Sequence, residues 1–299
     1  MRAGGSYHVD GARGWHGKGA IMRFATLRVG ESTRMAVDYE THFRLTPFPD
    51  LAAALKSFGG DVASLADVST DESIAREDAT YAQPVIDPDK IICLGLNFSD
   101  HVAEMSRTGT GFPTLFAKFP STLTGPYDDI VHTGVSEAMD WEVELAVIIG
   151  KPARFVTEAG ALDHVAGYTI LNDISMRDYQ NRTSQFLQGK IFEATTPVGP
   201  HMVTRDEVDD GRNLSLTMEL DGELMQSGKT TQMIFGIAET ISYISQITTL
   251  LPGDLVSMGT PSGVGAGRKP PLFLEPGMVI RTSVEGIGSL ENRIVGRPA

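Results

Sequence analysis

Positions 140–149 of the chain read Asp140-Trp141-Glu142-Val143-Glu144-Leu145-Ala146-Val147-Ile148-Ile149. The alternation of acidic and apolar residues predicts one β-strand with Asp140, Glu142 and Glu144 on the same face. Residues two apart on a strand have Cα atoms about 6.6 Å apart, so two carboxylates can converge on one point. Buried carboxylates are costly without a cation. This stretch is therefore either a solvent-facing acidic edge or part of a metal site.

The composition is that of an ordinary globular protein with a sizeable core, at 299 residues, 41% hydrophobic and 21% charged. A net charge of -13 argues against nucleic acid or an anionic membrane as the main partner, but it leaves room for a small anionic substrate. The single cysteine, Cys93, fits a reducing compartment, and no apolar run approaches the ~20 residues of a membrane span. We expect a cytoplasmic protein that binds neither nucleic acid nor membrane.

Three segments of different character follow one another along the chain. Residues 1–21 are Gly-rich without an apolar period and predict a disordered extension. Residues 22–85 predict a small N-terminal domain, with a hairpin around 30–33 and a helix from Leu51 capped by Asp50. Residues 86–299 carry many strand patterns and few long helices, which is typical of a β-rich α+β domain.

Several polar residues interrupt these patterns where chemistry would need them. His101 and Glu104 are three apart on a short helix, which the spacing of Asn97 and Asp100 predicts to begin with a capping box. A His oriented by a carboxylate can deprotonate water, although an ordinary surface helix fits the same pattern. Asp173 ends a buried strand, and a buried Asp needs a partner.

Further candidates follow Asp173. Ser175 and Asp178 predict a second capping box, which would place Arg177 and Gln180 on the first turns of a helix. Lys190 precedes a strand-like Ile-Phe pair, and in a pocket it would stabilise developing negative charge. The Gly-rich loop from Gly259 and Thr260 lacks the features of a P-loop, but its amides and hydroxyl can hold a carboxylate.

Six segments together resemble the fumarylacetoacetate hydrolase family, in the order found there. They are "IICLGLNFSDHVAEM", "DWEVELAVIIGK", "LNDISMRDYQ", "QGKIFEATTPVGP", "MGTPSGVG" and "EGIGSLENRI". The resemblance is to bacterial acylpyruvases and oxaloacetate decarboxylases. It implies a β-rich roll of mixed sheets over 86–299, preceded by the small N-terminal domain, and a homodimer.

The resemblance also implies roles for individual residues. It makes Glu142, Glu144 and Asp173 the metal ligands, with Asp140 outside the ligand set. Three carboxylates suit Mg²⁺ or Mn²⁺ better than Zn²⁺. The resemblance makes His101, Glu104 and Lys190 catalytic residues. The substrate-binding residues that it implies are Arg177, Gln180, Gly259 and Thr260. Leu96 departs from the family, since many members carry a basic residue there, and Glu193 stands where Asp is common.

The implied activity is a divalent-metal-dependent hydrolase that cleaves a C–C bond in 2,4-dioxo acids of acylpyruvate or fumarylpyruvate type, through a metal-bound enolate. The same enolate forms when oxaloacetate loses CO₂, so an oxaloacetate decarboxylase is the first alternative. An isomerase or hydratase of related dienoates comes next. A non-catalytic binding protein is the last reading, because none of the expected site residues is missing.

Overall fold

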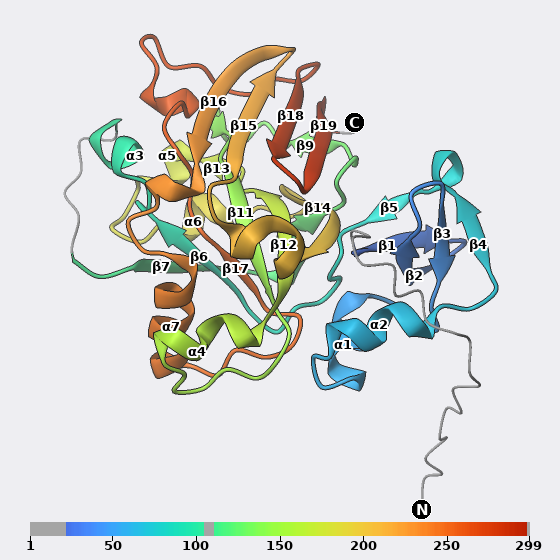
Figure 1. Cartoon of the computed structure of the whole chain (residues 1–299). Helices are drawn as coiled ribbons and strands as arrows, with labels where there is room; N and C mark the ends of the chain where they lie inside the picture. The colour runs from blue at the N-terminus through green and yellow to red at the C-terminus, as the bar shows by residue number, and fades with distance from the viewer. Residues whose placement is uncertain (1–21, 105–110, 298–299) are drawn as a thin grey trace, which may run out of the picture.

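The computed structural model describes residues 22–104 and 111–297, so the predicted extension at 1–21 lies outside the described residues (Figure 1). A large mixed sheet and a smaller five-stranded sheet form most of the molecule, with short helices at their edges. The fold is therefore α+β and rich in strand, as the sequence predicts.

The N-terminal unit is a small sheet covered by two helices (Figure 1). The Asp50 side chain accepts a hydrogen bond from the Ala53 amide at 2.8 Å, which confirms the predicted cap. The elements of this unit are β1 (Arg23–Val29), β2 (Ser32–Asp38), β3 (His42–Leu45), α1 (Leu51–Ser57), α2 (Val62–Leu65), β4 (Ser73–Ala75) and β5 (Tyr81–Ala82). Strand β1 pairs with β14 of the larger part, so one sheet runs through both.

The large sheet has the order β4-β3-β2-β1-β14-β12-β11-β17-β6-β7. Its central strands β11 and β12 are buried along their whole length, which explains their continuous apolar sequences. The strands not yet given are β6 (Ile91–Gly95), β7 (Thr114–Lys118), β11 (Val143–Ile149), β12 (Val165–Asn172), β14 (Thr196–Thr204) and β17 (Leu255–Ser257), with β8 (Leu123–Thr124) paired to β14.

The smaller sheet has the order β16-β15-β18-β19-β9. Leu216, Met218 and Leu220 alternate inward along β15 and share the core cluster of β11 and β12, so this sheet packs over the centre of the large one. Its strands are β9 (Ile130–His132), β15 (Ser215–Leu220), β16 (Glu223–Lys229), β18 (Val279–Val284) and β19 (Gly288–Gly296).

Short elements complete the larger part and carry much of the candidate site. They are α3 (Ser99–Glu104), β10 (Met139–Asp140), α4 (Glu158–Ala161), β13 (Ser175–Met176), α5 (Arg177–Gln180), α6 (Leu187–Lys190) and α7 (Ile237–Ile247). Helix α7 buries Ile237, Ile241 and Ile244 against the core.

The prediction of one unbroken strand over 140–149 is wrong. Asp140 belongs to β10, which pairs with β13, and β11 begins only at Val143. Side chains take the place of a strand partner in the gap, because Asn172 Oδ1 accepts from the Glu142 amide at 2.9 Å and Gln226 Oε1 from the Val143 amide at 3.0 Å. Periodicity cannot reveal such a break, since the residues on both sides keep their alternation.

Both predicted capping boxes are also wrong. The Asn97 amide group bonds to Phe235 and to the Met258 carbonyl, so it joins two loops and α3 begins after it. Ser175 lies in β13 and donates to the Asp173 carbonyl, and its helix α5 has Met176 at the N-cap. Distant partners thus take the Asn97 side chain and a neighbouring carbonyl takes the Ser175 hydroxyl, so neither side chain is left for a cap.

One prediction near these elements is wrong as well. The Ile-Phe pair after Lys190 is not a strand, and β14 begins only at Thr196.

A buried histidine at the junction of the two parts gives the fold a testable pH dependence. Burial, with the positive charge of Arg23, lowers the pKa of His201 to about 4. The unfolded chain binds a proton near pH 6.5, so stability falls as the pH drops from 6.5 to 4, by about 3 kcal/mol in total. We expect His201→Gln to lose this part of the pH dependence in urea unfolding between pH 7 and 4. Equal pH slopes for the variant and the wild type would contradict the assignment.

Candidate active site

Three carboxylates meet in the interior beside the central strands. Glu142, Glu144 and Asp173 are buried, and each offers one oxygen that lies within 4.8 Å of the others. Glu144 projects from β11, while Glu142 and Asp173 occupy the turns just before β11 and just after β12. The Asp173 amide donates to the Glu142 carbonyl at 3.0 Å, and this bond brings the two turns together. The structure therefore assembles the three ligands that the resemblance implies.

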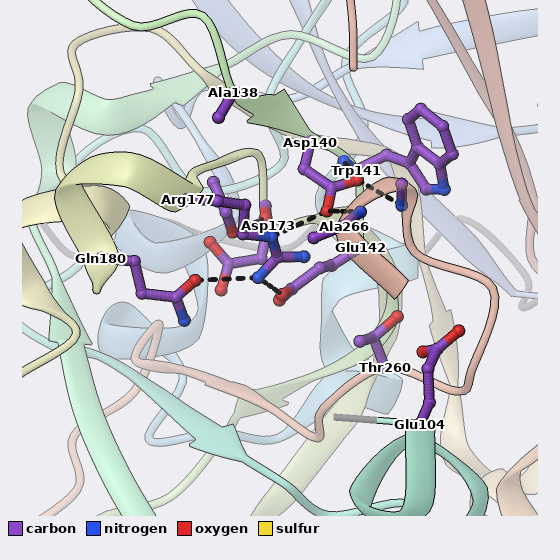
Figure 2. A network of polar contacts seen from close by, with 12 residues as sticks. Glu104, Ala138, Asp140, Trp141, Glu142, Asp173, Arg177, Gln180, Thr260 and Ala266 are labelled. Atoms are coloured by element: carbon purple, nitrogen blue, oxygen red, sulfur yellow. Dashed lines mark hydrogen bonds and ion pairs between the residues drawn. The ribbon is translucent and has the colours of Figure 1, made fainter. Parts of the chain in front are cut away.

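Two buried cations from short helices neutralise part of this cluster. Lys190 Nζ lies 2.7 Å from Glu142 Oε2 and 2.9 Å from Asp173 Oδ2. Arg177 spans two carboxylates, with Nε 2.7 Å from Asp140 Oδ2 and Nη1 2.7 Å from Glu142 Oε1 (Figure 2). Burial opposes ionisation of Glu142, but Lys190 and Arg177 outweigh it and lower the pKa of that carboxyl to about 2.

A third buried cation, Lys118, was missed by the sequence reasoning. It ends β7, its Nζ lies 2.6 Å from Asp173 Oδ1, and it also donates to the Lys190 carbonyl. Its side chain is fully buried, which is rare for lysine unless it is paired. Nothing in the pattern of β7 marks it, because a strand often ends in a lysine exposed to solvent.

Glu144 differs from the other two ligands because no cation of the described residues pairs with it. Its Oε2 accepts from the Ser257 hydroxyl and from the Gly259 amide at 2.9 Å. Burial raises the pKa of Glu144, and the charges of Asp173 and Glu142 raise it further, to about 8. Both of these hydrogen-bond donors are neutral, so they do not balance the negative charge of an ionised Glu144.

The residues present fit a hard divalent cation. The donor set is three carboxylates, which suits Mg²⁺ or Mn²⁺. Among the described residues Glu144 has only neutral hydrogen-bond donors, and a bound cation would supply the missing positive charge. Glu142, Glu144 and Asp173 are the residues that would hold it.

His101 of the predicted dyad lines a cavity that Glu142 and Glu144 also line. His101 Nδ1 lies 3.1 Å from Glu104 Oε2, and the other oxygen of Glu104 accepts from the Gly263 amide at 2.9 Å. His101 is only 6% exposed, so the alternative of an ordinary surface helix does not hold. Glu104 rises from α3 towards the loop that carries Thr260 (Figure 2).

One cavity connects the carboxylates with most of the predicted residues. Its lining includes His101, Glu142, Glu144, Arg177, Gln180, Lys190 and Thr260. The rest is largely apolar: Leu94, Gly95, Leu96, Phe116 and Phe186, with Asn181. The Phe116 and Phe186 rings meet edge to face at 5.9 Å. Leu96 has a positive φ of 58°, which is uncommon for a leucine and indicates a constrained backbone at the cavity wall.

The residues predicted to bind substrate differ in whether their polar groups are free to reach the cavity. Gln180 Oε1 accepts from Arg177 Nη1 at 2.9 Å, so the pair acts as one unit (Figure 2). Thr260 lines the cavity, but its hydroxyl already accepts from Gln226 Nε2 at 2.8 Å. The Gly259 amide points at Glu144 instead of the cavity, so it supports a ligand and not a substrate.

Glycine at position 189 allows the two short helices to meet. A Cβ there would lie 2.6 Å from Gln180 Cβ and 2.6 Å from the Met176 carbonyl oxygen. Because α5 and α6 touch at this point, Arg177 can reach Glu142 Oε1 while Lys190 reaches Glu142 Oε2.

Comparison with known proteins agrees with this geometry. Residues 90–295 match the fumarylacetoacetate (FAA) hydrolase C-terminal family. The chain belongs to the fumarylacetoacetate hydrolase family. It is 43% identical over 224 residues to the mitochondrial oxaloacetate tautomerase FAHD2B of Bos taurus, covering 74% of this chain and 71% of that protein. The chain is accordingly an enzyme of this family.

Solved structures of family members superpose over nearly the whole chain. The fumarylacetoacetate hydrolase of Exiguobacterium antarcticum has a TM-score of 0.82 and 35% identity, over 92% of this chain and 100% of that one. The 2-hydroxyhepta-2,4-diene-1,7-dioate isomerase of Mycobacterium marinum has a TM-score of 0.76 and 28% identity, over 93% and 100%. Within the described residues, the helices are too short or too polar to span a membrane.

If Glu144 is a metal ligand, one substitution there should weaken Mn²⁺ binding without lowering the stability of the metal-free protein. Glu144→Gln keeps an oxygen for Ser257 and Gly259 but removes a charge, so we expect Mn²⁺ affinity by calorimetry to fall at least tenfold. Without metal the variant should be no less stable than the wild type in thermal unfolding, because like-charge repulsion is relieved. Glu193→Gln, at an exposed carboxylate, is the matched control. Unchanged Mn²⁺ affinity in Glu144→Gln would refute the ligand assignment.

Proposed function

We propose that this enzyme transfers a proton at C3 of a 2-oxo acid and so interconverts its keto and enol forms, with oxaloacetate as the first candidate substrate. The observation that carries the proposal is a cavity lined by His101, the partner of Glu104, together with two of the three converging carboxylates and two cationic side chains. The oxaloacetate tautomerase of Bos taurus, at 43% identity, supports the choice of reaction.

The divalent cation that Glu142, Glu144 and Asp173 would hold supplies Lewis-acid polarisation of a 2-oxo acid when bound. The chain's own residues provide the rest. Lys190 adds positive charge beside Glu142 and Asp173, where negative charge develops on the substrate oxygen. Its ammonium stays protonated because those two carboxylates raise its pKa against the effect of burial.

His101 is the candidate base. An ionised Glu104 can only accept a hydrogen bond, so His101 Nδ1 carries the proton and Nε2 has a free lone pair. That nitrogen can take a proton from C3 and return it to the enolate oxygen, which completes the keto-to-enol shift with no net proton change. Glu104 keeps the imidazole in this tautomer.

Arg177 is the candidate anchor for the substrate carboxylate. Its Nη2 is buried and has no hydrogen-bond partner among the described residues, while Nε and Nη1 are both paired. A buried N–H without an acceptor is costly, and a substrate carboxylate in the adjoining cavity would satisfy it.

Hydrolysis of 2,4-dioxo acids is the second candidate, favoured by the same dyad. Here His101 deprotonates a water that attacks the 4-carbonyl, and the C–C bond breaks to release the enolate of pyruvate. The likeness to the Exiguobacterium antarcticum fumarylacetoacetate hydrolase supports it. Decarboxylation of oxaloacetate passes through the same enolate but needs no base. Its rate should therefore not depend on His101, unlike the rates of tautomerisation and hydrolysis.

The test measures three reactions of the purified protein with Mg²⁺: loss of enol-oxaloacetate absorbance, pyruvate release from acetylpyruvate, and CO₂ release from oxaloacetate. We expect tautomerisation to be fastest and His101→Ala to lower it by about 10²- to 10⁴-fold, the usual contribution of an acid–base group. His132→Ala, on β9 outside the cavity, is the control.

Each other outcome overturns a stated part of this proposal. Pyruvate release from acetylpyruvate without tautomerisation would replace the tautomerase by the hydrolase. A wild-type rate of tautomerisation in His101→Ala would remove His101 as the base. Activity unchanged by a chelator would exclude the metal.

A further inference from the structure

The Gly-rich loop at residues 259–267 gives backbone N–H groups to carboxylates from three separate elements. The Gly259 amide donates to Glu144, and the Gly263 amide to Glu104, each at 2.9 Å. The amides of Gly265 and Ala266 donate to Asp140 at 2.7 and 3.0 Å. One loop thus contacts a candidate metal ligand, the candidate dyad and the partner of Arg177.

Asp140 joins this loop to the substrate-binding side of the cavity. Its Oδ1 accepts from the amides of Trp141 and Gly265, and its Oδ2 accepts from Ala266 and from Arg177 Nε (Figure 2). The carboxylate is 0% exposed, so all four donors reach it without water. Asp140 therefore sets the position of Arg177 and of the loop at the same time.

The loop in turn holds α3, which carries the dyad. Ser262 Oγ donates to Asp100 Oδ2 at 2.9 Å, one turn of α3 before Glu104. A Cβ at Gly267 would lie 2.5 Å from Glu104 Cδ, so the glycine is needed for this close approach. Glu104 is thus fixed between the Gly263 amide and the backbone at position 267.

The opposite side of the loop is held equally firmly. Gln226 Nε2 donates to Thr260 Oγ1 and to the Pro261 carbonyl, each at 2.8 Å, and Trp141 Nε1 donates to the Gly263 carbonyl at 3.2 Å. A Cβ at Gly265 would lie 1.9 Å from the Leu272 carbonyl oxygen, which leaves no room for a side chain. The loop is therefore a rigid support and its amide positions are set before any ligand binds.

We propose that Asp140 is a positioning residue that, through residues 259–267, aligns the substrate arginine Arg177 with the His101–Glu104 dyad. Substrate anchoring and proton transfer need a common geometry, and among the described residues this carboxylate is the one group bonded both to Arg177 and to the loop that holds Glu104. The roles of Arg177 and His101 rest on the proposed function, whereas the link between the loop and α3 does not.

Two variants test the link from its two ends. Asp140→Asn keeps the size of the side chain but replaces one acceptor oxygen with a donor, so two of its four bonds are lost. Gly267→Ala inserts a Cβ against Glu104 and leaves Arg177 and the metal ligands untouched. Gly296→Ala is the control, because its Cβ would meet nothing within 4 Å.

Hydrogen exchange of the α3 amides is measured on the full chain without substrate. We expect at least tenfold faster exchange in Asp140→Asn and Gly267→Ala than in the wild type and Gly296→Ala. Mn²⁺ affinity should change less than threefold in Gly267→Ala, because the three candidate ligands and Arg177 keep their contacts. Unaltered α3 exchange in Gly267→Ala would overturn the proposal even if Asp140→Asn failed to fold.

Kinetics with the substrate found active separate the two ends. Gly267→Ala should lower kcat about tenfold with KM within twofold, because only the dyad moves. Asp140→Asn should lower kcat and also raise KM, because Arg177 moves too. A normal KM in Asp140→Asn would overturn the role towards Arg177. If the wild type turned over none of the 2-oxo acids, the proposed function would fail while the exchange result still decided the loop's role.

Discussion

The burial of like charges at one point is the constraint on which the rest of this structure depends. Asp140, Glu142, Glu144 and Asp173 are all nearly inaccessible to solvent, and ionised carboxylates in such a place are tolerated only when they are paired. The three buried cations come from three elements, β7, α5 and α6: Lys118, Arg177 and Lys190. When all four carboxylates are ionised, the three cations leave one negative charge unbalanced, and a divalent cation would balance it.

Neutral hydrogen-bond donors stabilise the carboxylates that the three cations do not pair. The loop at 259–267 contributes five amides to carboxylates, and these carry no charge that would compete with a bound cation. This division explains why Glu144 has a hydroxyl and an amide as partners while Glu142 has two cations. The unpaired ligand is the one whose charge a metal ion has to balance.

The proposed reactions can share one cavity because each would pass through an enolate. Under that proposal the carboxylate cluster and Lys190 would bind the 2-oxo acid and the dyad would transfer the proton. Selectivity among substrates would then depend on the apolar part of the lining, which includes Leu96, Phe116 and Phe186. The related proteins carry names that range from hydrolase to tautomerase and isomerase.

The sequence by itself determined the α+β class, the hairpins and most of the polar residues of the site, because periodicity and turn signals report which faces are buried and where strands end. It did not determine the break after Asp140 or the role of Lys118. Both depend on partners far along the chain: Gln226 lies 83 residues from Val143, and Asp173 lies 55 from Lys118. Only the strand order, which places β7, β11, β12 and β17 around one point, brings such partners within hydrogen-bonding distance.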